Sequence, residues 1–437
     1  MRAASAPAFT EHPLRREIVT EMHLRRFPMV TLPAHVIQLV RIVDQSQETL
    51  ETSALAFLPG QRGISVPRHC EGHWSSNVKA SWERHSEAST VTVTVTGDAA
   101  AGIDWSWPLC AAAATGLQWA ERLPGNVIRA TRLLIVASDA EAASLVEAAN
   151  FGQSHLVSCH LDGGVRLWSD FRIHPDGYGR VVIAANGAVG ATLARCIQRL
   201  QELGNYRNLA LLGLPLARTT WARLDDIERA LAHTGQLLLA DLLRDDDLLA
   251  ALTLQSEKLL SIAAEIEFRM SATAAYAIIV ADRLDELKAM PISGFQSLDD
   301  FTSRRFNPAV RTCDAVSRRL ELLNARASQF TSLLRTRIET HIENQNGRLL
   351  RSMDDSIRMQ LRLQHLVEGL SAVAISYYLL GLLSYPLKAA DHAWGVLPST
   401  SLLGVGAPLI LIAVWIALLC MRKRAIGEKQ NLQEHGQ

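Results

Sequence analysis

The sequence lacks the short motifs that identify the common enzyme classes. It holds no Walker A loop, no Gly-x-Ser-x-Gly elbow, no His-Glu-x-x-His pair and no Gly-x-Gly-x-x-Gly fingerprint. The nearest candidate, Gly177-Tyr178-Gly179, is too short to cradle a phosphate and falls where a hairpin turn is expected. We therefore expect a protein with no catalytic residues and no cofactor.

Cysteine is sparse, and its spacing is not that of a metal site. The chain has six cysteines and no Cys-x-x-Cys pair, so we expect reduced, scattered thiols in a cytosolic body. A zinc site built from His69, Cys70, Cys159 and His160 is conceivable, because these are the usual ligand types. Adjacent His-Cys pairs lack the usual ligand spacing, however, and we expect no metal.

Neither sign of charge is in excess, since 44 Lys and Arg residues balance 44 Asp and Glu residues. A dedicated nucleic-acid-binding protein normally has a basic excess, so no nucleic-acid partner is expected. No apolar core of signal-peptide length follows Met1, which argues against a cleavable secretory signal. With 437 residues, 48% of them hydrophobic, the chain is long enough for at least two domains with buried cores.

Two long uncharged runs lie close to the C-terminus. They extend from Gly369 to Leu387 and from Leu402 to Met421. At about 1.5 Å per residue, each covers most or all of a hydrocarbon layer roughly 30 Å thick. The runs predict a transmembrane hairpin with helices at 366–387 and 402–421, joined by an external loop at 388–401.

Basic residues near the two spans predict their orientation. Four arginines precede the first span: Arg348, Arg351, Arg358 and Arg362. Three basic residues follow the second span: Arg422, Lys423 and Arg424. The loop holds a single lysine, Lys388. We expect a two-pass protein of the cytoplasmic (inner) membrane. The lipid bilayer is then its partner, both termini are cytoplasmic, and residues 422–437 form a tail.

The first 189 residues read as a mixed α/β cytoplasmic domain. Runs rich in β-branched or alternating apolar residues predict strands at 34–43, 89–96, 127–137, 165–174 and 180–184. A turn at Pro175-Asp176-Gly177 joins the last two. The 141–149 stretch is expected to be helical.

Strand patterns then give way to helical ones. Residues 190–305 form a predicted helical region, and Asn307-Pro308 is a strong helix-start signal for a long stalk helix at 306–365. Apolar side chains recur along it at heptad spacing, which indicates a buried seam at Val316, Leu320, Leu323, Phe330 and Leu334. The seam could pack on the 191–290 helices of the same chain or on a second copy. Residues 344–347 are its weakest point.

The chain resembles a bacterial family of predicted membrane-anchored proteins whose domain has no known function. The resemblance covers nearly the whole chain, and its most distinctive stretches are 12–15, 82–87, 170–180, 311–313, 360–364 and 367–371. It implies no activity, substrate or catalytic residue.

The layout is also loosely similar to that of the CorA-type magnesium channels. These pentamers have an α/β cytoplasmic domain, a long stalk helix, two spans and a basic tail, and their Gly-Met-Asn signature closes the first span. The corresponding place here reads Gly381-Leu382-Leu383-Ser384-Tyr385-Pro386, without that signature. A likeness of layout is analogy only.

Two polar clusters are candidate ligand or partner faces. One is Trp82, Glu83, Arg84 and His85, where a local ion-pair cluster is the alternative. The other is the face of a predicted strand, where a solvated sheet face is the alternative: Arg166, Trp168, Asp170, Arg172 and His174.

Two functions are consistent with this organisation. The first is a homo-oligomer that self-associates through its stalk and transmembrane helices and could surround a pore or transport an ion. The second is a non-transporting membrane anchor or scaffold whose α/β domain binds a cytoplasmic ligand or protein.

Overall fold

The computed structural model describes residues 12–15, 18–19, 29–60, 68–106, 110–152, 155–240, 243–394, 404–418 and 420. The chain divides into two compact units, residues 1–331 and 332–437.

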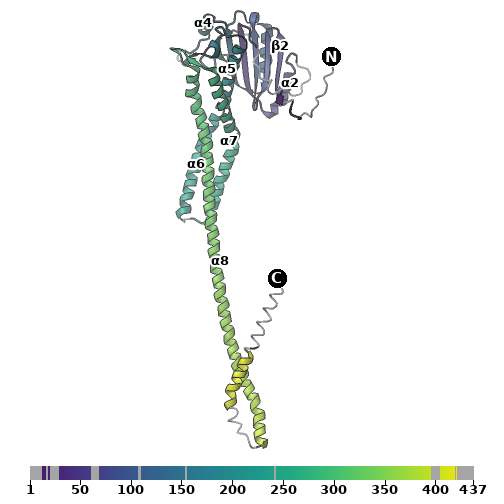
Figure 1. Cartoon of the computed structure of the whole chain (residues 1–437), viewed down its shortest axis with the longest axis vertical. Coiled ribbons are helices and arrows are strands. Elements are labelled where there is room, and N and C mark those ends of the chain that lie inside the picture. Colours follow the sequence, from purple (N-terminus) through teal and green to yellow (C-terminus); the bar gives the residue numbers. More distant parts are fainter. Residues whose placement is uncertain are drawn as a thin grey trace. The chain divides into compact units, whose positions relative to one another are not determined.

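A nine-stranded sheet forms the body of the first unit. Its strand order is β2-β3-β4-β1-β5-β8-β7-β6-β9. Figure 1 shows the sheet, with β2 labelled. The β5–β8 pair is parallel and the other paired strands are antiparallel. The strands are β1 (Ala34–Ile42), β2 (His69–Ser75), β3 (Val78–Arg84), β4 (Ala88–Thr96), β5 (Asn126–Val136), β6 (Val157–His160), β7 (Arg166–Ser169), β8 (Gly179–Ala184) and β9 (Met290–Pro291).

Helices cover both faces of this sheet. One face packs against α5 and α7 in the largest apolar cluster, which includes Leu133, Ile183, Ile197 and Val280. The other face packs against shorter helices, with Trp82 and Leu134 in two separate clusters. The helices are α2 (Glu48–Leu55), α3 (Ala111–Arg122), α4 (Asp139–Ala148), α5 (Gly190–Leu211), α6 (Gly213–Ala240), α7 (Asp245–Leu287) and α8 (Leu298–Trp394).

The strands predicted from β-branched and alternating residues are present as β1, β4, β5 and β8. Nearly every side chain of β1 and β4 is buried, on both faces, because these are inner strands of a covered sheet. The sequence patterns did not predict β2 and β3, whose sequences HCEGHWS and VKASWER carry few β-branched residues.

The predicted strand at 165–174 is too long. The strand β7 ends at Ser169, and Phe171 adopts a φ of 50°, which no continuing strand can hold. The sheet also extends past the predicted boundary at residue 189. The short strand β9 pairs with β6, and Ser158 donates its backbone N–H to the carbonyl of Gln296 (3.0 Å).

The long helix begins earlier than its proline signal predicts. It starts at Leu298, where Ser297 Oγ accepts the backbone N–H of Asp300 (3.1 Å) and two aspartates occupy the first turn. Asn307 and Pro308 lie inside the helix. A proline there removes one backbone hydrogen bond, but burial of the flanking Phe306 and Ala309 favours the continuous helix. The helix is unbroken through 344–347, and its described part extends to Trp394, past the predicted end of the span at 387.

Within the first unit, the apolar seam of α8 packs on helices of the same chain. Val316, Leu320 and Leu323 are buried. The ring of Phe330 lies so close to Gly235 of α6 that an added Cβ would come within 2.6 Å of it. Beyond the seam, Arg319 pairs with Glu228 of α6 (2.5 Å). This is the intramolecular alternative, and this part of the seam needs no second copy to cover it. Leu334, which belongs to the second unit, is also buried.

Candidate functional site

The segment between β7 and β8 holds most of the second predicted cluster, but not as one strand face. Arg166 lies over the ring of Trp168 (4.5 Å to its centre) and pairs with Asp139 (2.7 Å). Asp170 and His174 come from the loop beyond β7. Arg172 is exposed. The backbone turn at Phe171 therefore divides the five residues into two groups.

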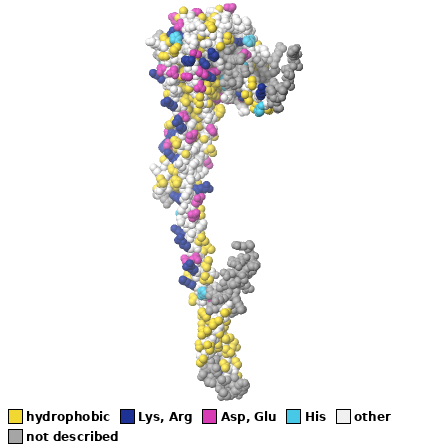
Figure 2. All heavy atoms as spheres, viewed as in Figure 1, with side chains coloured by type: hydrophobic (Ala, Val, Ile, Leu, Met, Phe, Trp, Pro, Cys, Tyr) yellow, Lys and Arg dark blue, Asp and Glu magenta, His cyan; other side chains and the backbone are white. Residues whose placement is uncertain are grey.

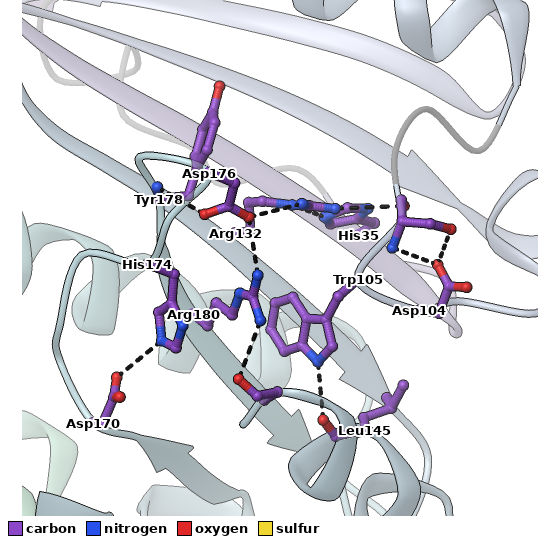
Figure 3. Close-up of polar contacts among 12 residues, drawn as sticks. His35, Asp104, Trp105, Arg132, Leu145, Asp170, His174, Asp176, Tyr178 and Arg180 are labelled. Carbon is purple, nitrogen blue, oxygen red and sulfur yellow. Dashed lines mark hydrogen bonds and ion pairs between the residues drawn. The ribbon is translucent and has the colours of Figure 1, made fainter. Parts of the chain in front are cut away.

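Asp170 and His174 face one another across this loop (Figure 3). Both side chains are largely buried, and His174 Nε2 lies 3.3 Å from Asp170 Oδ1. The backbone N–H of Arg172 also donates to this oxygen (3.1 Å). The pair closes the loop on itself, so its first role is to fix the shape of the segment.

Two arginines of the parallel strand pair share one carboxylate beside this loop. Arg132 of β5 and Arg180 of β8 are opposite each other in register. Asp176 Oδ2 accepts from Arg132 Nη1 (3.4 Å) and Arg180 Nη2 (3.2 Å), as Figure 3 shows. Both guanidinium groups lie over Trp105, 5.9 and 5.1 Å from its ring centre. Two cations on one carboxylate leave this cluster net positive and suited to an anionic or acidic partner.

A buried histidine adjoins the same arginines. His35 of β1 is fully buried and accepts from Arg132 Nε (3.4 Å). Burial, together with the charge of Arg132, lowers the pKa of His35 to about 3 from its ordinary value of 6.5. His35 is therefore neutral at physiological pH.

This histidine predicts a dependence of stability on pH. Between pH 6.5 and 3 the unfolded chain binds a proton at His35 that the folded protein does not, so the free energy of unfolding rises with pH in this window. Denaturation of the full chain in detergent should show a slope between pH 6.5 and 5 that His35→Gln reduces by up to about 1.4 kcal/mol per pH unit. Equal slopes in wild type and His35→Gln would contradict this assignment.

The first predicted cluster does not converge on a pocket. Trp82 is buried, and its Nε1 donates to Glu51 of α2 (2.9 Å), which also accepts from Arg84 Nη2 (2.7 Å). Glu83 is half-buried on the same strand. His85 points to the opposite side of the sheet, against Thr90 (2.9 Å) and the ring of Tyr206. Alternation along β3 sends these neighbours to different faces, and Trp82 and Arg84 hold α2 on the sheet.

The conceivable zinc set is divided by the sheet. His69 and Cys70 are on β2, whereas Cys159 and His160 are on β6, with six strands between them. At about 4.8 Å per strand the pairs lie on the order of 30 Å apart. Among the residues that the structure describes, no group of three or more His, Cys, Asp or Glu side chains could hold a metal ion.

The sequence patterns did not single out two arginines of β5, one of which, Arg132, belongs to the cluster beside Trp105. Arg129 and Arg132 interrupt a strand that is otherwise apolar in its second half and sits at the centre of the sheet. A charged side chain is seldom buried without a partner, so an arginine inside a central strand was the available signal. Its partners, however, come from distant parts of the chain.

Comparisons with known proteins give a family but no activity. No curated protein and no solved structure matches the chain. The family model described as "Protein of unknown function (DUF3422)" matches residues 10–425. The chain therefore belongs to the DUF3422 family of proteins of unknown function.

Proposed function

We propose that this protein is a membrane-anchored binding protein without catalytic activity, whose α/β domain captures a cytoplasmic ligand or protein. The observation that supports the anchor is the bare apolar surface of α8 in the second unit. Leu370 and Tyr377 are each 74% exposed, and Leu382 is 69% exposed. In water such a surface is an aggregation liability, whereas in lipid it is the normal exterior of a spanning helix.

The length of this surface fits a bilayer. The predicted span at 366–387 would be about 33 Å long at 1.5 Å per residue, against a hydrocarbon layer of roughly 30 Å. Among the described residues, one helix, α8, is both long enough and apolar enough to cross a membrane. A shorter apolar helix follows at Gly404–Leu418. Hydrophobic side chains gather over this part of α8 in Figure 2. We propose that the two helices form the hairpin, with both termini cytoplasmic.

The binding role rests on the positive charge around the segment between β7 and β8 and on the strands β5 and β8 beside it. Arg132 and Arg180 outnumber the one carboxylate that they share, Asp176, and the exposed Arg172 adds a further charge. These side chains come from the sheet and one loop, which is how many binding sites are built on rigid scaffolds.

A homo-oligomeric pore has less support. The seam residues Val316, Leu320 and Leu323, whose exposure would have favoured a multi-chain stalk, are covered within one chain. The Gly-Met-Asn signature of the CorA-type channels is also missing, since the corresponding place reads Gly381-Leu382-Leu383. Self-association would then use the transmembrane helices or the stalk beyond the seam, where Leu349 and Met353 are 62% and 60% exposed.

Cysteine labelling tests the anchor and its topology. In a chain whose native cysteines are replaced, a cysteine at Ser399 should react with an impermeant maleimide on intact cells, because it lies in the proposed external loop. A matched cysteine at Gln430 should react only after lysis. Both positions lie outside the described residues. The protein should also stay in the membrane pellet after alkaline carbonate extraction. Release by carbonate would rule out the anchor, and the reverse labelling pattern would rule out the orientation.

A further inference from the structure

A small cavity opens in the first unit between the amino ends of β5 and β8, the loop before β8, and α5. Its volume is about 160 Å³. Four arginines line it, together with polar, small and apolar residues, and no aspartate or glutamate is among the described residues of its wall: Arg129, Arg172, Arg180 and Arg207. Arg180 pairs with Asp176 and Arg172 is exposed, whereas Arg129 and Arg207 are largely buried without a carboxylate in this wall. That is unusual, because buried cations are normally paired with carboxylates.

Arg129 is held in place by neutral groups. Its Nη1 donates to the side-chain oxygens of Gln38 (2.9 Å) and Asn205 (2.7 Å). Its Nη2 donates to Gln201 Oε1 (2.7 Å). The guanidinium also lies directly on Gly204 of α5, where an added Cβ would come within 2.6 Å of Nη2. These contacts fix the orientation of the guanidinium and leave its charge uncompensated.

Arg207 of α5 is stacked and not paired. Its guanidinium lies over the rings of Phe171 (4.8 Å) and Phe301 (5.7 Å), which pack against each other. Its Nη1 is buried and has no hydrogen-bond partner among the described residues. The wall therefore contains a fixed guanidinium group with an unused donor.

The electrostatics agree with this geometry. Burial, with the neighbouring charge of Arg207, lowers the pKa of Arg129 to about 9. Burial lowers the pKa of Arg207 to about 10. Two like charges thus lie close together without a counter-charge among the described residues, and a bound anion would relieve both the repulsion and the desolvation.

We infer that this cavity is a binding site for the phosphate group of a small soluble phosphate monoester. Planar guanidinium forks match phosphate oxygens, and the three terminal oxygens of a monoester can accept from several forks at once. A cavity of this size is well below the roughly 300–1,000 Å³ of sites for drug-sized ligands, so the phosphate and a short substituent fill it. The site is independent of the membrane anchor.

Calorimetric titration of the full chain in an uncharged detergent tests this site. The probes are inorganic phosphate and glycerol 3-phosphate, at constant ionic strength with chloride as the reference salt. Both probes should bind saturably. Arg207→Gln should weaken glycerol 3-phosphate binding by about tenfold or more, because hydrogen bonds to charged groups are the stronger class. Arg207→Lys keeps the charge without the fork and should weaken binding to a lesser extent.

Two further variants complete the test. Arg129→Gln and Gly204→Ala should both weaken binding, the second by displacing the Arg129 guanidinium while leaving every arginine in the chain. Because Arg129 bridges a buried network, these variants require a folded circular dichroism spectrum before titration; Arg207→Gln, which disturbs only a stacked side chain, does not depend on them. Arg195→Gln, at an exposed position of the same helix, is the matched control and should bind as wild type does.

Three outcomes would overturn the inference. One is the absence of saturable binding of either probe at millimolar concentrations. Another is an equal affinity in wild type and Arg207→Gln. The third is binding of short-chain phosphatidate with no binding of glycerol 3-phosphate, which would make a lipid headgroup the source of the phosphate and exclude a soluble ligand.

Discussion

Glu51→Ala is expected to lower the free energy of unfolding by about 3–5 kcal/mol, because it removes one partner of a buried ion pair. The Glu51 side chain is 0% exposed, and its two oxygens accept from Trp82 Nε1 (2.9 Å) and Arg84 Nη2 (2.7 Å). Its charge also favours the protonated form of the buried Arg41, whose pKa burial lowers. Without Glu51, Arg84 and the indole N–H of Trp82 lose a buried acceptor, and Arg41 loses a negative charge that interacts with it.

The control for this prediction uses the same arginine. Glu48 pairs with Arg84 Nη1 at 3.1 Å, but its side chain is half exposed. Glu48→Ala should therefore cost less than about 1 kcal/mol, as exposed pairs do. Chemical denaturation of both variants in detergent, followed by circular dichroism, gives the comparison. Similar losses in the two variants would show that burial does not set the strength of this pair.

Leu323→Ala should destabilise the helical part of the first unit by about 2–5 kcal/mol, the usual cost of truncating a buried leucine. Leu323 is 2% exposed, whereas its neighbour Leu322 is 67% exposed. Leu322→Ala, the same chemical change one position away, should cost within about 0.5 kcal/mol. Thermal denaturation at several protein concentrations is the measurement, because packing within one chain gives a midpoint that does not depend on concentration. Equal midpoints for the two variants, or a midpoint that rises with concentration, would contradict intramolecular packing of the seam.

The parts of the fold that were predictable are those in which local composition and packing agree. The alternation of Val91, Val93 and Val95 is enough to define β4, because the buried sheet requires the same residues. The start of α8 was not predictable from Asn307-Pro308, since burial of Phe306 and Ala309 overrides a local signal. The strand β9 is two residues long and exists only because β6 lies beside it.

The candidate sites also divide into features that the sequence suggests and features that only the fold brings together. Trp82 through His85 are adjacent in sequence, which suggested a cluster, yet a strand sends alternate side chains to opposite faces. Arg129 and Arg207 are far apart in the sequence and meet only because α5 packs on β5. The periodicity of a single sequence cannot predict that two such distant residues lie close together in the fold. An inward arginine marks a position that needs explaining, and its partners become visible only in three dimensions.

The odd spacing of the two arginines in β5 has a consequence for how this domain can vary. Arg129 and Arg132 are three positions apart on one strand, so their side chains emerge on opposite faces, one toward α5 and the other toward Trp105. Because β5 is clamped between β1 and β8, it cannot shift its register without moving every apolar neighbour to the wrong side. A single inserted or deleted residue between the two would turn one arginine out of its site, whichever half of the strand kept its place. The register of β5 thus fixes the positions of both arginines, one on each face of the sheet. This stretch of chain should therefore tolerate substitutions far better than changes in length.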